Sequence, residues 1–169
     1  METRAERFQK WLTYSLLSLL FLGIQGLFFA PTPFSGLTPT LIPLLPAMVG
    51  VCEPDAQGLA WGVCYGTLCD LALCGPFPCF YLLLSLLIVL TAGGLCVRLL
   101  NRGILCSLAA CASALLISAL LHIAVLLSRG AEALPLLRYG ATEFLLSLPI
   151  VFILHYPFML LHRQIHLYD

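Results

Sequence analysis

The stretch GLAWGVCYGTLCD, which runs from residue 58 to residue 70, decides the fold because small residues recur in it every four positions and lead to an aspartate. These positions are Gly58, Gly62, Gly66 and Asp70. Residues four apart lie on one face of an α-helix, with a drift of about 40° per step. In lipid, glycines allow two helix backbones to approach closely. The stretch therefore predicts a membrane helix whose glycine face is a contact surface, either within its own bundle or for the membrane helix of a partner protein.

The composition of the whole chain favours a membrane protein. Hydrophobic residues make up 61% of the 169 residues and charged residues only 9%, and the mean hydropathy is +1.02. A soluble domain carries about 25% charged residues, which it needs to cover its surface. The net charge is zero, and the chain has no basic patch with interleaved aromatic residues, which argues against a nucleic-acid partner.

Six apolar stretches are separated by proline, glycine and charged residues. They predict an all-α polytopic membrane protein with six transmembrane helices in one compact bundle, a single domain over residues 1–169. The expected spans are residues 11–30, 37–52, 57–74, 77–97, 104–127 and 138–161. In the second span, Pro39 suits a first helical turn, whereas Pro43 and Pro46 lie inside the stretch and should kink the helix. The first stretch is too long for the apolar core of a signal peptide, so it is expected to be a span.

The Lys and Arg residues predict the orientation of these spans. With a cytoplasmic N-terminus, six of the eight lie on the cytoplasmic side: Arg4, Arg7, Lys10, Arg98, Arg102 and Arg163. Arg129 and Arg138 then lie outside. Because loops that stay in the cytoplasm carry the excess of Lys and Arg, both termini are expected to be cytoplasmic.

Asp70, His122 and Glu143 are titratable residues within three of the expected spans, and each lies about one helical turn (~5 Å) from the outer end of its span. An ionisable group inside a membrane costs a few kcal/mol and normally faces the bundle interior. The three residues therefore predict a polar cluster in the outer half of the bundle. Two interpretations stay open: a ligand site or proton relay, and interfacial residues that reach headgroup water.

The remaining reactive residue types predict no catalytic or metal site. The eight cysteines include no C-x-x-C pair and mostly lie in apolar runs, where they are expected to pack as small apolar residues. A disulfide between Cys74 and Cys79, which flank a short turn, is the alternative for that pair. His155 lies in mid-span and is interpreted as a hydrogen-bonded packing residue. The sequence has no P-loop, H-E-x-x-H, dinucleotide fingerprint or Ser-His-Asp arrangement, so neither a catalytic residue nor a cofactor is expected.

Residues 38–127 resemble the rod-shape-determining protein MreD family. The resemblance rests on a helix that opens with proline, PTLIPLLP at residues 39–46, on a short polar link, and on the helix patterned G-x-x-x-G-x-x-x-G-x-x-x-D described above. The chain length and a final span that contains Pro149 are also similar.

The resemblance implies a non-enzymatic role in the cell-elongation machinery that supports lateral peptidoglycan synthesis and cell shape, in the bacterial cytoplasmic (inner) membrane. The partners it implies are MreC, RodA, a class B penicillin-binding transpeptidase and MreB. It also implies a fold similar to the substrate-binding S components of energy-coupling-factor vitamin transporters. Such an S component is the alternative function, although the first span lacks the alanine row through which S components contact their coupling partner.

Overall fold

The computed structural model describes residues 4–26, 40–73, 75–98 and 104–166. This described part of the chain is all-α and contains six helices and no strand. The helices are α1 (Arg4–Ile24), α2 (Leu44–Cys52), α3 (Ala56–Ala72), α4 (Phe80–Arg98), α5 (Ile104–Ser128) and α6 (Ala133–His166). The expected all-α fold with six helices is confirmed.

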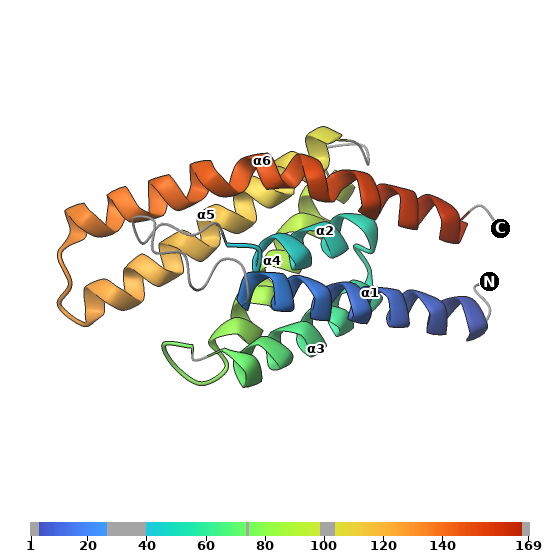
Figure 1. The fold of residues 1–169 in the computed structure, drawn as a ribbon, viewed down its shortest axis with the longest axis horizontal. Helices are drawn as coiled ribbons and strands as arrows, with labels where there is room; N and C mark the ends of the chain where they lie inside the picture. Colours follow the sequence, from blue (N-terminus) through green and yellow to red (C-terminus); the bar gives the residue numbers. More distant parts are fainter. Residues whose placement is uncertain (1–3, 27–39, 74, 99–103, 167–169) are drawn as a thin grey trace.

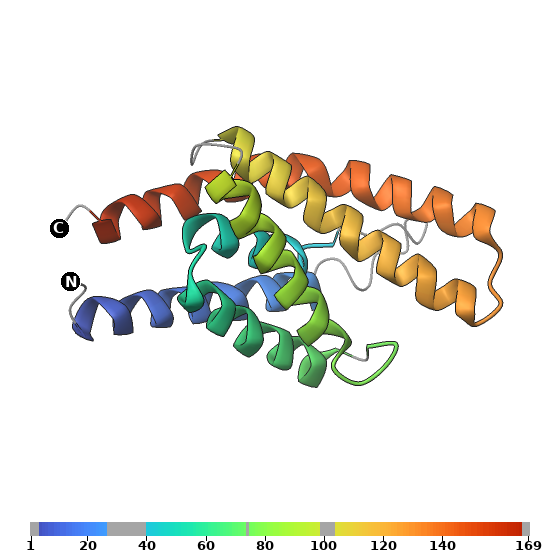
Figure 2. The same ribbon diagram turned by 180° about the vertical axis from the view of Figure 1, so that it is seen from behind.

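Successive helices run in alternating directions along one elongated bundle (Figure 1). The first turn of α1 and the last turn of α6 lie at the same end, and the view from behind in Figure 2 shows the same arrangement. The α3–α4 connection and the α5–α6 turn lie toward the opposite end. The bundle therefore has one end with the first turn of α1 and the last turn of α6, and an opposite end with these two connections.

The short helix α2 forms the centre of the bundle. All nine of its residues are buried, and it contacts α3, α4, α5 and α6. Nine helical residues rise about 13 Å, less than half of the roughly 30 Å hydrocarbon core of a bilayer. A helix that is apolar on every side belongs in the interior, and Leu44, Met48 and Val51 are accordingly inaccessible.

The prolines at the start of α2, Pro43 and Pro46, do not lie inside a long helix as expected. The helix begins at Leu44, so the described part of the expected span 37–52 opens with a non-helical stretch, residues 40–43. Pro43 lies at the N-cap position, and Pro46 lies in the first turn, where a backbone N–H would have no intrahelical acceptor. The predicted kink is therefore wrong, because both prolines mark the start of a helix. Pro39 lies outside the described residues.

The other expected spans agree more closely with the helices, except at the chain ends. The helix expected over residues 138–161 is longer and runs over Ala133–His166. Its additional first turn contains Pro135, a residue that the start of a helix tolerates. The first helix likewise begins earlier, at Arg4, and the residues expected at its end, 27–30, lie outside the described part.

Two helices of the described chain are long and apolar enough, by length and composition, to cross a membrane: Ile104–Ser128 and Ala133–Tyr156. Shorter apolar stretches, Trp11–Ile24 and Phe80–Cys96, lie in α1 and α4. Large apolar side chains are also exposed outside the core, among them Phe152 and Ile153, of whose surfaces 59% and 73% are accessible. A large exposed apolar surface of this kind favours association with a membrane.

Candidate functional site

The glycine face of α3 is filled from within the bundle. A Cβ atom added to Gly66 would lie 2.5 Å from the Cα of Leu82, and one on Gly62 would lie 3.0 Å from Cγ2 of Val89. A Cβ on Gly58 would lie 2.0 Å from a backbone oxygen of the link before α3. All three glycines are buried. In the structure, glycine at these positions lets α3 lie directly against α4 and the preceding link.

Asp70 completes this contact by capping the next helix. Its Oδ1 accepts the backbone N–H of Tyr81 at 2.9 Å, and its Oδ2 accepts that of Leu82 at 3.0 Å. These N–H groups belong to the first turn of α4, where intrahelical acceptors are missing. Capping usually comes from Ser, Thr, Asp or Asn just before the helix, but Cys79 holds that place, with a φ of 64°. The acceptor is therefore supplied by α3.

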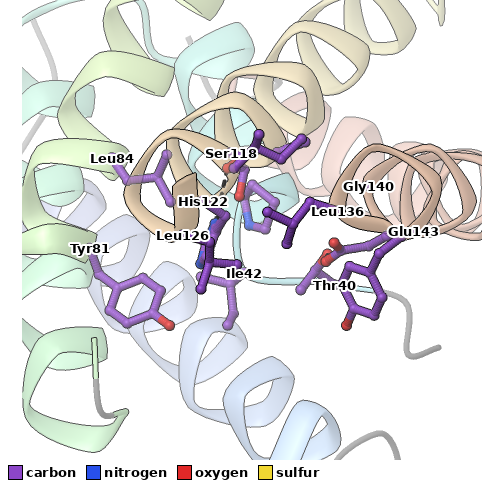
Figure 3. A pocket seen from close by; sticks show the side chains of 14 residues that line it. Thr40, Ile42, Tyr81, Leu84, Ser118, His122, Leu126, Leu136, Gly140 and Glu143 are labelled. Carbon is purple, nitrogen blue, oxygen red and sulfur yellow. Dashed lines mark hydrogen bonds between the residues drawn. The ribbon is translucent and has the colours of Figure 1, made fainter. Parts of the chain in front are cut away.

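A cavity of about 210 Å³ lies between the non-helical stretch 40–43 and helices α4, α5 and α6 (Figure 3). Its α4 residues come from the start of that helix, its α5 residues from the second half and its α6 residues from the first third. It therefore lies in the half of the bundle remote from the first turn of α1 and the last turn of α6. The lining residues are mostly apolar, with Thr40, Tyr81, Ser118, His122, Tyr139 and Glu143 as the polar members.

The polar side chains of the cavity are held by local hydrogen bonds. The Thr40 hydroxyl donates to Oε1 of Glu143, which joins the stretch before α2 to α6. Nδ1 of His122 lies 2.9 Å from the carbonyl oxygen of Ser118, one turn earlier in α5. The imidazole ring also packs edge-on against Phe80, with 4.9 Å between ring centroids. Figure 3 shows Tyr81 on one side of the cavity and Thr40 with Glu143 on the other.

The non-helical stretch before α2 has its backbone groups bonded by side chains from other helices. Ser147 of α6 accepts the N–H of Thr40 at 3.1 Å, and Gln25, just after α1, accepts the N–H of Leu41 at 2.9 Å. The Tyr65 hydroxyl donates to a carbonyl of the stretch at 3.3 Å. Buried backbone groups outside helices need such partners, because an unpaired N–H or C=O is costly. These side chains therefore allow the stretch to stay non-helical inside the protein.

The structure brings together two of the three residues of the expected polar cluster. His122 and Glu143 line the same cavity. Asp70 does not line it, because its carboxylate caps α4, although Tyr81, whose N–H it accepts, does. The contributions of Thr40 and Tyr81 were missed from the sequence.

A spacing signal could have found two further members of the cavity. Ser118 precedes His122 by four residues on α5, and Tyr139 precedes Glu143 by four on α6. Residues four apart share a helix face, so each titratable residue has a polar neighbour on its own face. Both pairs line the cavity.

Other polar contacts lie outside the cavity. Nδ1 of His155 is 2.9 Å from the hydroxyl of Ser107, so α6 and α5 are hydrogen-bonded there, as expected of a packing histidine. The thiols of Cys96, near the end of α4, and Cys106, near the start of α5, lie 3.0 Å apart. They are at the end of this helix pair remote from the cavity. The proposed partner of Cys79, Cys74, lies outside the described residues.

The arrangement offers a rigid helix pair and a mostly apolar cavity with a few polar groups. Within the described residues, no three His, Cys, Asp or Glu side chains converge as metal ligands would. A comparison with protein-family models, curated proteins and solved structures finds no match to this chain.

Proposed function

We propose that this chain is a multi-pass protein of the bacterial cytoplasmic membrane in which all six apolar segments lie within the bilayer and both termini are cytoplasmic. The alternating helix directions and the shared end of α1 and α6 support an even number of crossings (Figure 1). In this arrangement α2 is the inner part of a broken segment that the stretch before it extends. The bias of Lys and Arg supplies the orientation. Reporter fusions at both ends, one active only in the cytoplasm and one only outside, test it.

Within the membrane, we propose that the protein is a non-enzymatic scaffold of the cell-elongation machinery, similar in role to MreD. The observation that carries the proposal is that Gly58, Gly62, Gly66 and Asp70 act together as one structural unit. These are the residues on which the resemblance rests, and each makes a contact that few other residue types could make. The motif on which the resemblance rests therefore has a defined structural role in this chain, which supports the proposal more strongly than a repeat of glycines alone.

In this proposal, partner helices dock on the outer surface of the bundle, because α4 already covers the glycine face. The outer face of α1 suits a single membrane helix such as that of MreC. Tyr14 and Ser18 point inward and are each 5% exposed, whereas more than half of the surface of each neighbouring outer leucine is accessible. These outer residues are Leu12, Leu16, Leu19 and Leu20. MreB, RodA and a class B penicillin-binding transpeptidase are the further proposed partners.

Co-purification and photo-cross-linking test the scaffold function. The tagged chain and MreC are expressed together, and the complex is purified in mild detergent. A photoreactive amino acid at Leu16 on the outer face of α1 is expected to cross-link to MreC. The same group at Leu120, which is 58% exposed on α5, is the matched control and is expected to give no MreC product. Absence of MreC from the purified material would contradict the proposal.

A carrier that captures a vitamin, like an S component, is the second candidate because the structure contains a cavity in one half of the bundle, which is the outer half in the orientation proposed above. In that orientation, a molecule arriving from outside would reach the cavity of about 210 Å³ first. Mass spectrometry of small molecules released from the purified chain distinguishes the candidates. A tightly bound vitamin without MreC would replace the scaffold proposal, whereas MreC without a vitamin supports it.

A further inference from the structure

The cavity between the stretch 40–43 and helices α4–α6 has room for a small organic molecule. Its volume of about 210 Å³ exceeds the roughly 150 Å³ of an engineered protein cavity that binds benzene. Ile42, Leu84 and Leu126 are among the apolar residues that line it. Ligand sites combine an apolar wall with a few polar groups that fix orientation. The cavity therefore suits an apolar body of about ring size with one polar end.

The polar groups of the cavity favour a ligand that donates hydrogen bonds. Because a carbonyl oxygen only accepts, the short contact to Ser118 places the proton of His122 on Nδ1. In the neutral ring, Nε2 then presents a lone pair. The carboxylate of Glu143 also accepts, and it uses one oxygen for the Thr40 hydroxyl. Two residues that can accept hydrogen bonds, His122 on α5 and Glu143 on α6, thus line the same cavity.

Glu143 has no cationic partner among the residues that the structure describes. The guanidinium of Arg129, at the end of α5, donates instead to the carbonyl of Pro76 at 2.5 Å. A carboxylate among apolar residues is costly unless a positive charge or hydrogen-bond donors compensate it. A cationic ligand in the cavity would provide both.

We propose that this cavity binds a small amphiphilic ammonium ion, with its N–H groups directed toward Glu143 and His122 and its apolar body along the aliphatic wall. Tyr81 and Tyr139 also line the cavity, and aromatic rings attract cations. The ammonium group belongs either to a soluble amine or to the headgroup of an ethanolamine lipid. The proposal goes beyond the scaffold function and does not depend on it.

Calorimetry on the full-length chain tests the charge preference of the cavity. The protein is placed in phosphatidylcholine nanodiscs, because the quaternary ammonium of choline has no N–H donor. Phenethylamine is titrated in, followed by two probes of similar size, neutral propylbenzene and anionic 3-phenylpropionate. Phenethylamine is expected to bind at one site at least about tenfold more tightly than either, as a charge-assisted hydrogen bond predicts. Equal binding of the three probes, or no binding of the amine, would overturn the proposal.

Matched variants locate the binding site. Glu143→Gln is expected to weaken phenethylamine binding about tenfold or more, whereas Glu132→Gln, the same change of charge on the exposed turn before α6, should leave affinity within about twofold. Ala119→Leu fills the cavity and should abolish binding, whereas Ala124→Leu on the exposed side of α5 should not. The Ala119 pair keeps the proposal testable if Glu143→Gln fails to fold. Unchanged affinity in Ala119→Leu, or in a folded Glu143→Gln, would place any amine site elsewhere and overturn the proposal.

A change of lipid identifies the source of the ammonium group. Phosphatidylethanolamine carries an N–H donor, so nanodiscs made from it should compete with phenethylamine if the cavity takes the lipid headgroup. Weaker phenethylamine binding in these nanodiscs identifies the lipid, and unchanged binding identifies a soluble amine. A chain that co-purifies with MreC but binds no amine would refute this inference and leave the scaffold proposal standing.

Discussion

The Asp70 carboxylate accepts the backbone N–H of Tyr81 at 2.9 Å, so a side chain of α3 caps the first turn of α4. With the glycines that precede it, Asp70 makes the α3–α4 pair a clamp with close backbone packing in the middle and a charged cap at one end. The cost of a partly buried carboxylate is offset by two charge-assisted hydrogen bonds.

Removal of the cap is expected to lower stability. Asp70→Ala should reduce the free energy of unfolding by about 1–2 kcal/mol, because two N–H groups of α4 lose their acceptor. SDS titration of the protein in mixed micelles measures this energy. Asp55→Ala is the control, because Asp55 occupies the N-cap position of α3 without a side-chain capping bond. Equal losses in the two variants would show that the cap contributes nothing specific.

Addition of a single methyl group to the glycine face should separate α3 from α4. In Gly66→Ala the new Cβ would overlap the backbone of Leu82, and overpacking of this kind costs about 1–3 kcal/mol. Gly94→Ala on α4 is the matched control, since no atom lies within 4 Å of its added Cβ. It should stabilise the helix by up to about 1 kcal/mol. A tolerated Gly66→Ala would contradict the close contact.

Double-mutant cycles are expected to couple Glu143 to Thr40 and to separate it from Asp70. Thr40→Val and Glu143→Leu remove the two partners of one hydrogen bond, so their effects on unfolding free energy should be non-additive by at least about 0.5 kcal/mol. Asp70→Asn and Glu143→Leu share no hydrogen-bond partner in the described chain and should add within about 0.5 kcal/mol. Strong coupling in the second cycle would instead indicate that Asp70 and Glu143 belong to one cluster.

Oxidation is expected to join α4 to α5. The thiols of Cys96 and Cys106 lie 3.0 Å apart, so a small shift brings them to bonding distance. Diamide, a membrane-permeant two-electron oxidant, should accept two hydrogens from the pair and leave a disulfide. Mass spectrometry of peptides should show the cross-link, and Cys96→Ser should prevent it. A disulfide between either thiol and a different cysteine would contradict the geometry.

The helices were largely predictable from the sequence, because each apolar stretch is bounded by proline, glycine or charge. The residue at which α2 begins was not predictable from the sequence. Pro43 and Pro46 are compatible with a kink inside a long helix and with the first turn of a short one. What decides between them is the set of donors and acceptors on Gln25, Tyr65 and Ser147, which lie on other segments. No local pattern reveals these partners.

The candidate site was predictable in part for a similar reason. Depth along the spans predicted that His122 and Glu143 lie at one level, and both line the cavity. The position of Asp70 along its expected span could not show that its carboxylate accepts backbone N–H groups of α4. Almost every residue has a backbone N–H, so the sequence does not mark which of them a side chain will bind. Thr40 was missed because it was assigned to a regular helix, in which its hydroxyl would have a different direction.

The complete burial of α2 has a consequence for how the protein is made. In the proposed membrane arrangement, a buried helix of nine residues is too short for the insertion machinery to recognise as a membrane segment in its own right. The packing surfaces of α2, and most of the side chains that bond the stretch before it, come from segments that leave the ribosome later, α3 to α6. We therefore expect α2 to wait at the membrane surface or in the translocon until those helices emerge. Chains arrested during synthesis after α2 should leave it open to proteases, whereas chains arrested after α6 should protect it.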